Sequence, residues 1–189
     1  MMSANFSGKT LVTAMVGAAL LSGCGTLTSI NGDKSQTNMM ELPKEIEVPT
    51  GHERAMVGSV VNGTVTWLCA QNESGDYAWK FAGPSANLVD DSGNQIGSYY
   101  GPPATWEALD GSKVTGKQLA TAPAGAGNIP FQLVKATSVG PDGMMSDIAY
   151  IQRINLVGGA APATGCTKMS EGRRFVSGYT ADYVFWTAE

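Results

Sequence analysis

The stretch from Tyr77 to Lys117 reads YAWKFAGPSANLVDDSGNQIGSYYGPPATWEALDGSKVTGK, and it decides the fold class. Apolar and polar residues alternate along it, and Gly-Pro pairs and clusters of Asp, Ser and Gly interrupt the alternation at short intervals. Alternation places side chains on the two faces of a strand, whereas Gly, Pro and Asp favour tight turns. Trp79 and Trp106 lie in the alternating segments, where their large rings can fill a β core. The stretch therefore predicts short strands joined by turns, and it specifies no reaction.

The same pattern continues on both sides of this stretch. Met56–Val61 and Thr64–Ala70 are predicted to form a hairpin around Asn62-Gly63, because Asn-Gly is the strongest short hairpin signal. Further strands are predicted over residues 95–100, 105–109, 129–139, 147–157 and 179–186. No segment shows a sustained helical period, and the 24 Gly favour many turns. We therefore predict an all-β fold, an antiparallel β-sandwich or barrel of about ten short strands.

The overall composition fits one domain with few charges. The chain has 189 residues, a net charge of -4 and 15% charged residues. The 12 Lys and Arg do not cluster into a basic patch, which argues against nucleic acid as a partner. A single His and three Cys cannot supply a tetrahedral zinc site once two of the Cys are bridged, so we predict no metal and no cofactor.

The N-terminal segment, residues 1–23, has the architecture of a signal peptide. Lys9 precedes an apolar run from Leu11 to Leu21, which is too short to cross a hydrocarbon core of about 30 Å as a helix. Leu21-Ser22-Gly23-Cys24 resembles the lipobox of bacterial lipoproteins, which implies that Cys24 is acylated and becomes the first residue of the mature chain. The alternative is an ordinary secretory signal that leaves Cys24 as a free thiol.

Several acyl chains on Cys24, palmitate among them, would anchor the protein stably, since one chain alone binds a membrane only marginally. Residues 24–45 are polar and lack periodicity, so we predict a flexible tether followed by a single β domain over residues 46–189. Gly25 stands where lipoproteins retained at the inner membrane tend to carry Asp. The sequence thus predicts a lipid-anchored cell-envelope protein, at the outer membrane of a Gram-negative bacterium.

Acylation of Cys24 would leave an even pair, Cys69 and Cys166, in an oxidising compartment. We therefore predict a disulfide bond between them. Two buried free thiols are the alternative. In the chain-entropy account a bridge that closes so long a loop stabilises the fold by about 4 to 5 kcal/mol.

Eight segments of the mature chain are distinctive when taken together: Val48–Gly51, Trp67–Cys69, Ala78–Phe81, Gly97–Gly111, Ile129–Phe131, Tyr150–Asn155, Val157–Cys166 and Ala181–Tyr183. Through these residues, nearly the whole mature chain resembles a secreted family of unknown function found in bacteria and fungi. The family typically has a His-Tyr pair where this chain has Tyr99-Tyr100. Some fungal members carry a malate dehydrogenase label, which we reject because this chain lacks a Gly-x-Gly-x-x-Gly motif and alternating strands and helices.

Few residues offer catalytic chemistry. His52 has no nucleophile near it in the sequence, so a solvated surface role is favoured over that of a general base. Glu107 directly follows Trp106, and Asp110 follows shortly after it. Two carboxylates beside an aromatic ring could hydrolyse or bind a sugar. The alternative is that Glu107 faces solvent and that Asp110 caps a turn. We expect that catalysis is absent, with Glu107 and Asp110 as the only candidates.

Aromatic residues and one arginine complete the candidates. Tyr99, Tyr100 and Trp106 form a possible binding surface, although the alternating pattern favours a core position for each Trp. If Arg153 points inward it needs a buried acidic partner, and Asp182 on the last strand is the predicted one.

Three functions remain open. The first is a cell-envelope lipoprotein whose non-catalytic β domain binds an unknown ligand, such as a glycan or another envelope protein. The second is a secreted hydrolase of polysaccharides that uses Glu107 and Asp110. The third is a purely structural envelope protein.

Overall fold

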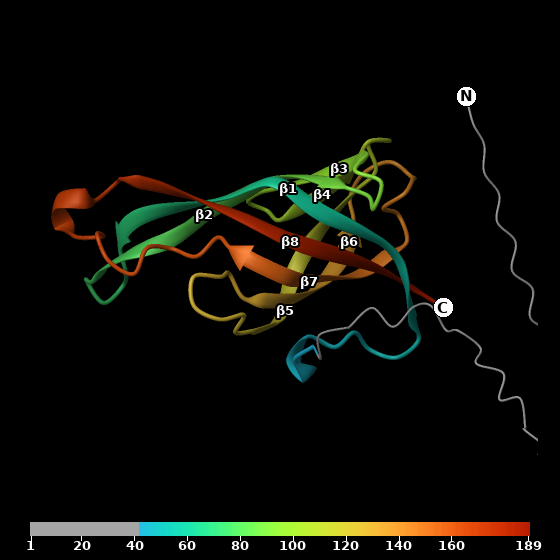
Figure 1. Cartoon of the computed structure of the whole chain (residues 1–189), viewed down its shortest axis with the longest axis horizontal. Helices are drawn as coiled ribbons and strands as arrows, with labels where there is room; N and C mark the ends of the chain where they lie inside the picture. Colours follow the sequence, from blue (N-terminus) through green and yellow to red (C-terminus); the bar gives the residue numbers. More distant parts are fainter. Residues whose placement is uncertain (1–41) are drawn as a thin grey trace, which may run out of the picture. The chain divides into compact units, whose positions relative to one another are not determined.

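The alternating segments form eight antiparallel strands that close into a barrel in the computed structural model, which describes residues 42–189 (Figure 1). Each strand pairs with its neighbours in the chain, and the last pairs with the first. The strands are β1 (His52–Gln71), β2 (Tyr77–Val89), β3 (Gln95–Tyr100), β4 (Thr105–Ala108), β5 (Lys113–Ala122), β6 (Phe131–Ser138), β7 (Ile148–Gly158) and β8 (Arg174–Ala188). Two 3-10 turns, η1 (Lys44–Ile46) and η2 (Lys168–Ser170), complete the elements. The all-β prediction is confirmed, as a barrel and not a sandwich.

Eight strands replace the ten predicted because two predicted breaks, at Asn62-Gly63 and at Gly83-Pro84, lie inside β1 and β2. β1 runs straight through Asn62-Gly63, where its pairing with β2 shifts between Val61 and Thr64. Asn62 has a φ of 53°, so the pair forms a β-bulge. A Cβ on Gly63 would lie 2.5 Å from the Tyr179 carbonyl oxygen. The predicted hairpin at Asn62-Gly63 is therefore wrong, since the same backbone conformation serves a tight turn and a bulge.

β1, β2 and β8 are the longest strands and extend together beyond the rest of the barrel (Figure 1). We call this extension the arm; it comprises residues 66–71, 77–82 and 174–178. Cys69 on the arm is joined to Cys166, in the connection between β7 and β8, by an S–S bond of 2.04 Å. The predicted disulfide is confirmed. It ties the arm to the connection that lies beside it.

A second layer covers part of the barrel's outer surface. η1 packs against β5 and β6, and Ile46 is completely buried there. The side chain of Gln152 on β7 donates a hydrogen bond to the Ile46 carbonyl oxygen at 2.7 Å. Leu42 also packs against the core, so the folded domain starts earlier than the predicted boundary at residue 46. We call residues 42–50 and the strand faces beneath them the outer layer.

The predictions for the N-terminal segment concern residues outside the described part. The signal peptide over residues 1–23, the acylated Cys24 and the tether up to residue 41 belong to this group. Within residues 42–189, no helix is long and apolar enough to cross a membrane.

Candidate ligand-binding cavity

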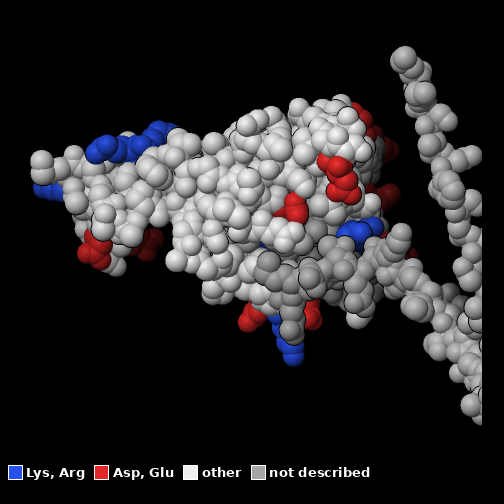
Figure 2. All heavy atoms as spheres, viewed as in Figure 1, with Lys and Arg blue, Asp and Glu red and all other residues white. Residues whose placement is uncertain are grey.

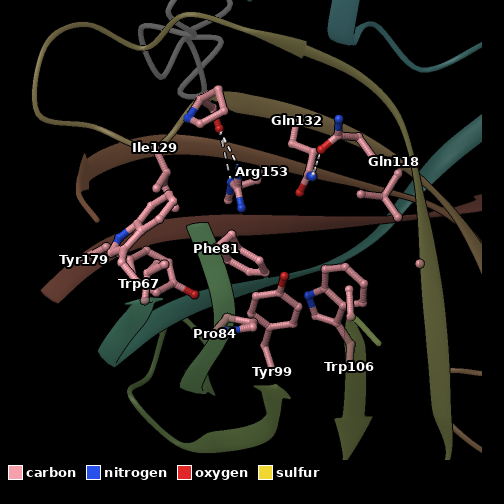
Figure 3. Close-up of a pocket in the computed structure, with 15 residues that line it drawn as sticks. Trp67, Phe81, Pro84, Tyr99, Trp106, Gln118, Ile129, Gln132, Arg153 and Tyr179 are labelled. Atoms are coloured by element: carbon pink, nitrogen blue, oxygen red, sulfur yellow. Dashed lines mark hydrogen bonds between the residues drawn. The ribbon is translucent and has the colours of Figure 1, made fainter. Parts of the chain in front are cut away.

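A cavity of about 400 Å³ lies inside the barrel, at the end where the arm begins (Figure 3). All eight strands contribute to its wall. The side chains and backbone that line it belong to Val65, Trp67, Phe81, Pro84, Tyr99, Ala104, Trp106, Gly116, Gln118, Ile129, Pro130, Gln132, Val134, Arg153 and Tyr179. Phe81 is 55% exposed and therefore marks where the cavity meets solvent. The cavity is thus part of the barrel's lumen, with its mouth beside the arm.

Tyr99 and Trp106 line one side of the cavity, and the fully buried Tyr183 packs against both rings. The centroids of Tyr99 and Trp106 lie 4.5 Å apart in a stacked arrangement, and Tyr183 contacts them at 4.9 Å and 5.5 Å. We call these three residues the aromatic floor. Gly116 on β5 makes room for it, because a Cβ at this position would lie 2.6 Å from Cζ3 of Trp106. A rigid floor of this kind keeps the cavity open without a ligand.

Arg153 brings a positive charge into the cavity, where it is only 8% exposed. Its Nε and Nη2 atoms donate hydrogen bonds to the Pro130 carbonyl oxygen at 3.2 Å and 2.9 Å. Among the described residues, no carboxylate lies within 4.0 Å of this guanidinium. A buried cation without a counter-ion is costly, so this arrangement calls for a function.

The predicted partner of Arg153, Asp182, is engaged elsewhere. Asp182 accepts hydrogen bonds from Ser59 at 2.7 Å and from Asn155 at 2.7 Å. In the pairing of β7 with β8, Arg153 stands opposite Tyr183 and its neighbour stands opposite Asp182. Successive residues of a strand face opposite sides, so Asp182 and Arg153 lie on different faces of the sheet. The predicted ion pair is therefore wrong.

Trp106 contributes a second polar group without a protein partner. The ring is fully buried, and its indole Nε1 makes no hydrogen bond within the described part of the chain. Buried N–H groups are nearly always paired, so this one stands out. Figure 3 shows Arg153 on one side of the cavity, and Tyr99 and Trp106 on the opposite side, with their polar atoms directed toward the same space.

The tyrosines around the cavity remain neutral. Burial raises the pKa of Tyr99 and Tyr183 well above 10.0, and it raises the pKa of Tyr179 to about 12. The nearby charge of Arg153 opposes these increases without cancelling them. At neutral pH the phenols therefore offer hydrogen bonds and no negative charge, and they cannot serve as counter-ions for Arg153.

The candidate carboxylates Glu107 and Asp110 lie outside this cavity. Glu107 accepts a hydrogen bond from the Tyr100 hydroxyl at 2.5 Å and pairs with Lys113 at 3.4 Å. The hydrogen bond from Tyr100 is the main cause that lowers the pKa of Glu107. Asp110 accepts hydrogen bonds from Ser112, the largest cause that lowers its pKa, and from the Met144 backbone. Glycoside hydrolysis needs one carboxyl group with a raised pKa as general acid, and neither group fits this role.

The structure also divides the predicted binding surface. Tyr99 and Trp106 point into the lumen, whereas Tyr100 lies on the outer face with Glu107. His52 is far from this set in the fold; its ring packs edge-on against Tyr150 at 4.8 Å. Trp106 is the only Trp that is fully buried, while the other three described Trp are half-buried. No group of three or more potential metal ligands occurs within residues 42–189.

Sequence reasoning did not identify Arg153, Trp67, Phe81 and Gln132 as members of one site. Trp67 and Phe81 form an edge-to-face pair at 5.9 Å at the mouth, and Gln132 donates a hydrogen bond to Gln118 at 2.7 Å beside it. The inward direction of Arg153 was the one available signal, because an Arg in an alternating strand is either exposed or paired.

Comparisons with known proteins place the chain in a family and give it no function. No curated protein matches the chain, and no solved structure does so. The family described as Protein of unknown function (DUF3455) matches residues 49–187, which include all eight strands except the outermost residue of β8. This match confirms the expectation of a family of unknown function. The chain therefore belongs to the DUF3455 family.

Proposed function

We propose that this protein is a cell-envelope lipoprotein whose barrel binds a small molecule in its lumen and does not transform it. The observation that carries the proposal is a preformed cavity with two buried polar groups, Arg153 and Trp106, that lack sufficient protein partners. Binding sites for small molecules are mostly apolar, with a few convergent polar groups. The lumen has this composition.

The dimensions of the barrel suit a small ligand. Barrels of about eight strands are either filled by side chains or hold one small ligand. The cavity of about 400 Å³ falls within the range of about 300 to 1,000 Å³ typical of ligand pockets. A monosaccharide or a compound of one or two rings fits this volume, whereas a polymer could enter with one end only.

The proposed location rests on two independent features of the chain. The first is the lipobox that ends at Cys24. The second is the disulfide bond between Cys69 and Cys166, because such bonds persist in oxidising compartments such as the periplasm. Replacing Cys24 with Ala and fractionating cells tests the anchor. Retention of the variant in the membrane fraction would contradict it.

A thermal-shift screen of the purified full-length protein, held in nanodiscs when its lipid anchor is present, tests binding. The panel contains oligosaccharides, neutral aromatic compounds, and small carboxylic acids with their amides. A ligand at about 100 times its Kd should add about 2.7 kcal/mol to the free energy of unfolding. Gln132→Trp, which adds bulk at the mouth, should abolish the shift. Thr137→Trp, on an exposed position of the same strand, should preserve it. A shift that survives Gln132→Trp would contradict lumenal binding.

The alternative of a polysaccharide hydrolase has a direct test. Glu107 and Asp110 should then confer activity on polysaccharides that Glu107→Gln abolishes. The hydrogen bonds that hold both carboxylates in their ionised form do not favour this alternative. A structural role in the envelope would instead predict no ligand in the screen and a stoichiometric protein or peptidoglycan partner.

A further inference from the structure

The charge inside the cavity restricts the kind of ligand. Arg153 is the only ionisable group with a formal charge at neutral pH among the residues that line it. The face shown in Figure 2 carries its Lys and Arg side chains in separate small groups at the surface, where water solvates them. Arg153 has little access to that water, since it is only 8% exposed. The cavity is therefore a positively charged site.

The hydrogen-bond donors inside the cavity are in excess over the acceptors. A guanidinium carries several N–H groups and no acceptor; Arg153 donates to the Pro130 carbonyl oxygen and lies beside the Tyr183 hydroxyl, and these two oxygens do not use all of its N–H groups. The Trp106 indole can only donate. An occupant that offers two acceptor oxygens and a negative charge would satisfy both groups, and a carboxylate is the smallest group that does so.

We propose that the cavity binds a small monocarboxylate, with its carboxylate between Arg153 and Trp106 and its apolar body beside Trp67 and Phe81. This inference rests on the lumenal binding proposed above and specifies its ligand class. The edge-to-face pair of Trp67 and Phe81 at 5.9 Å offers aromatic surface at the mouth, which suits a ring as the body. A ligand of this shape reaches from the buried cation to the solvent-exposed mouth.

The number of charges favours a carboxylate over a phosphate. A phosphate monoester carries about -1.5 to -2 charges at neutral pH, and one guanidinium would leave part of that charge uncompensated in a poorly solvated cavity. A carboxylate carries one charge, which Arg153 alone can balance. The Arg fork also matches the geometry of two carboxylate oxygens.

Calorimetric titration with three probes that share one body tests this inference. The probes are naphthylacetate, naphthylacetamide and naphthylmethylphosphonate, added to the full-length protein. We expect naphthylacetate to bind about tenfold or more tightly than the amide, because hydrogen bonds to charged groups contribute about 1.5 to 3 kcal/mol. The phosphonate should bind more weakly than the carboxylate.

Variants connect this preference to the residues of the cavity. Arg153→Met should remove the preference for the acid over the amide, and Trp106→Phe, which keeps a ring and lacks the N–H, should weaken acid binding by about threefold to tenfold. Arg174→Met removes an exposed Arg on β8 and should leave all three affinities unchanged. If Arg153→Met fails to fold, Trp106→Phe and Arg153→Lys provide the same comparison, since Lys keeps the charge and loses the fork.

The outcomes separate this inference from the proposed function. Equal affinities for acid and amide, tighter binding of the phosphonate, or a preference that survives Arg153→Met would overturn the carboxylate inference and leave lumenal binding intact. The carboxylate inference also fails, and lumenal binding stands, if none of the three probes binds while neutral compounds of the thermal-shift panel do. Binding that survives Gln132→Trp, or no binding of any compound, would overturn both.

Discussion

Gln152 and Arg153 are consecutive residues of β7, and both polar side chains are buried, at 3% and 8% exposure. Gln152 faces the outer layer, where it donates to the Ile46 carbonyl oxygen at 2.7 Å and accepts from the Trp186 indole at 3.0 Å. Arg153 faces the lumen, where it donates to one carbonyl oxygen and lies beside the Tyr183 hydroxyl, and no carboxylate of the described chain lies within 4.0 Å of it. One strand thus has a complete polar network on one face and an incomplete network on the other.

The difference separates a buried polar group that serves the fold from one that we propose serves a ligand. A buried group whose hydrogen bonds are complete fixes a contact, as Gln152 fixes η1 to the barrel. A buried charge whose hydrogen bonds are incomplete destabilises the fold, so its presence requires another explanation. Stability measurements on the two faces should therefore give opposite signs.

Removing the disulfide should have the largest effect on stability. It should affect the arm, beside the mouth of the cavity, more than the outer layer. The bond spans a sequence separation of 97 residues, so the double variant Cys69→Ser/Cys166→Ser should lose about 4 to 5 kcal/mol of unfolding free energy. Urea denaturation measures this loss. Hydrogen exchange should increase more in the arm, which carries Trp67 and Phe81, than in the outer layer, where only global unfolding adds to it. Faster exchange at Ile46 and Gln152 to the same degree would show that the two regions are not separate.

Alkaline pH should destabilise the aromatic floor and Tyr179, whose hydroxyl lies 3.4 Å from that of Tyr183. Burial raises the pKa of Tyr179 from 10.0 to about 12, and raises the pKa of Tyr99 and Tyr183 as well. The folded state therefore holds these protons more tightly than the unfolded chain does. The stabilisation is complete below pH 10 and is lost as the pH rises through the folded pKa values. At about pH 11 the free energy of unfolding should be lower by about 1.4 kcal/mol for each phenol, hence by about 4 kcal/mol for the three together.

Denaturation at a series of pH values, with phenolate absorbance recorded in parallel, measures this loss. Tyr183→Phe should reduce the dependence on pH by about one third, because one of three titrating groups is removed. If all 6 Tyr titrate reversibly near pH 10 while the protein remains folded, the floor is more open to water than its burial implies.

Gln152→Leu should destabilise the outer layer by about 2 to 3 kcal/mol, since it leaves the Ile46 carbonyl and the Trp186 indole without their partner. Gln132→Leu is the matched control. It removes a hydrogen bond to Gln118 at the mouth of the cavity, where water can replace it, and should cost less than about 0.5 kcal/mol. Chemical denaturation compares the two. Equal losses would mean that the hydrogen bonds of Gln152 stabilise the fold no more than the exposed hydrogen bond of Gln132 does.

The sequence predicts elements whose information is local. The strand predicted over Gln95–Tyr100 has the observed bounds, and that over Thr105–Leu109 ends one residue later than β4, because alternation is bounded by turn residues on both sides. Asn62-Gly63 shows the limit. Its positive φ was predictable, but pairing with both β2 and β8 decides between a turn and a bulge.

The candidate site depends on closure of the barrel, which local patterns do not contain. Alternation predicts that Trp106 faces inward, but only the order of all eight strands brings Arg153 and Trp106 to one cavity. The choice of Asp182 as the partner of Arg153 failed for the same reason. The pairing of β7 with β8 sets which residues share a face, and it is determined by contacts far apart in the sequence.

Apart from the control variants, Arg153→Met should have the smallest effect on stability, with the opposite sign. Replacing a buried charge by an apolar side chain of similar length removes its desolvation cost, so the free protein should gain about 1 kcal/mol of unfolding free energy. The Pro130 carbonyl oxygen loses its donor, but Pro130 is exposed and water can take its place. Arg174→Met, at a solvated position, should change the stability by less than about 0.5 kcal/mol.

Urea denaturation of the two variants and the wild type, with and without naphthylacetate, completes the comparison of the two faces. Without the probe, Arg153→Met should be the more stable protein, and with saturating probe the wild type should overtake it, because only the wild type gains binding energy from the buried charge. A loss of more than about 1 kcal/mol in the free variant would instead show that Arg153, like Gln152, belongs to the structural network of the barrel. If Arg153→Met is more stable than the wild type without naphthylacetate and less stable with it, Arg153 lowers the stability of the free protein and contributes to binding.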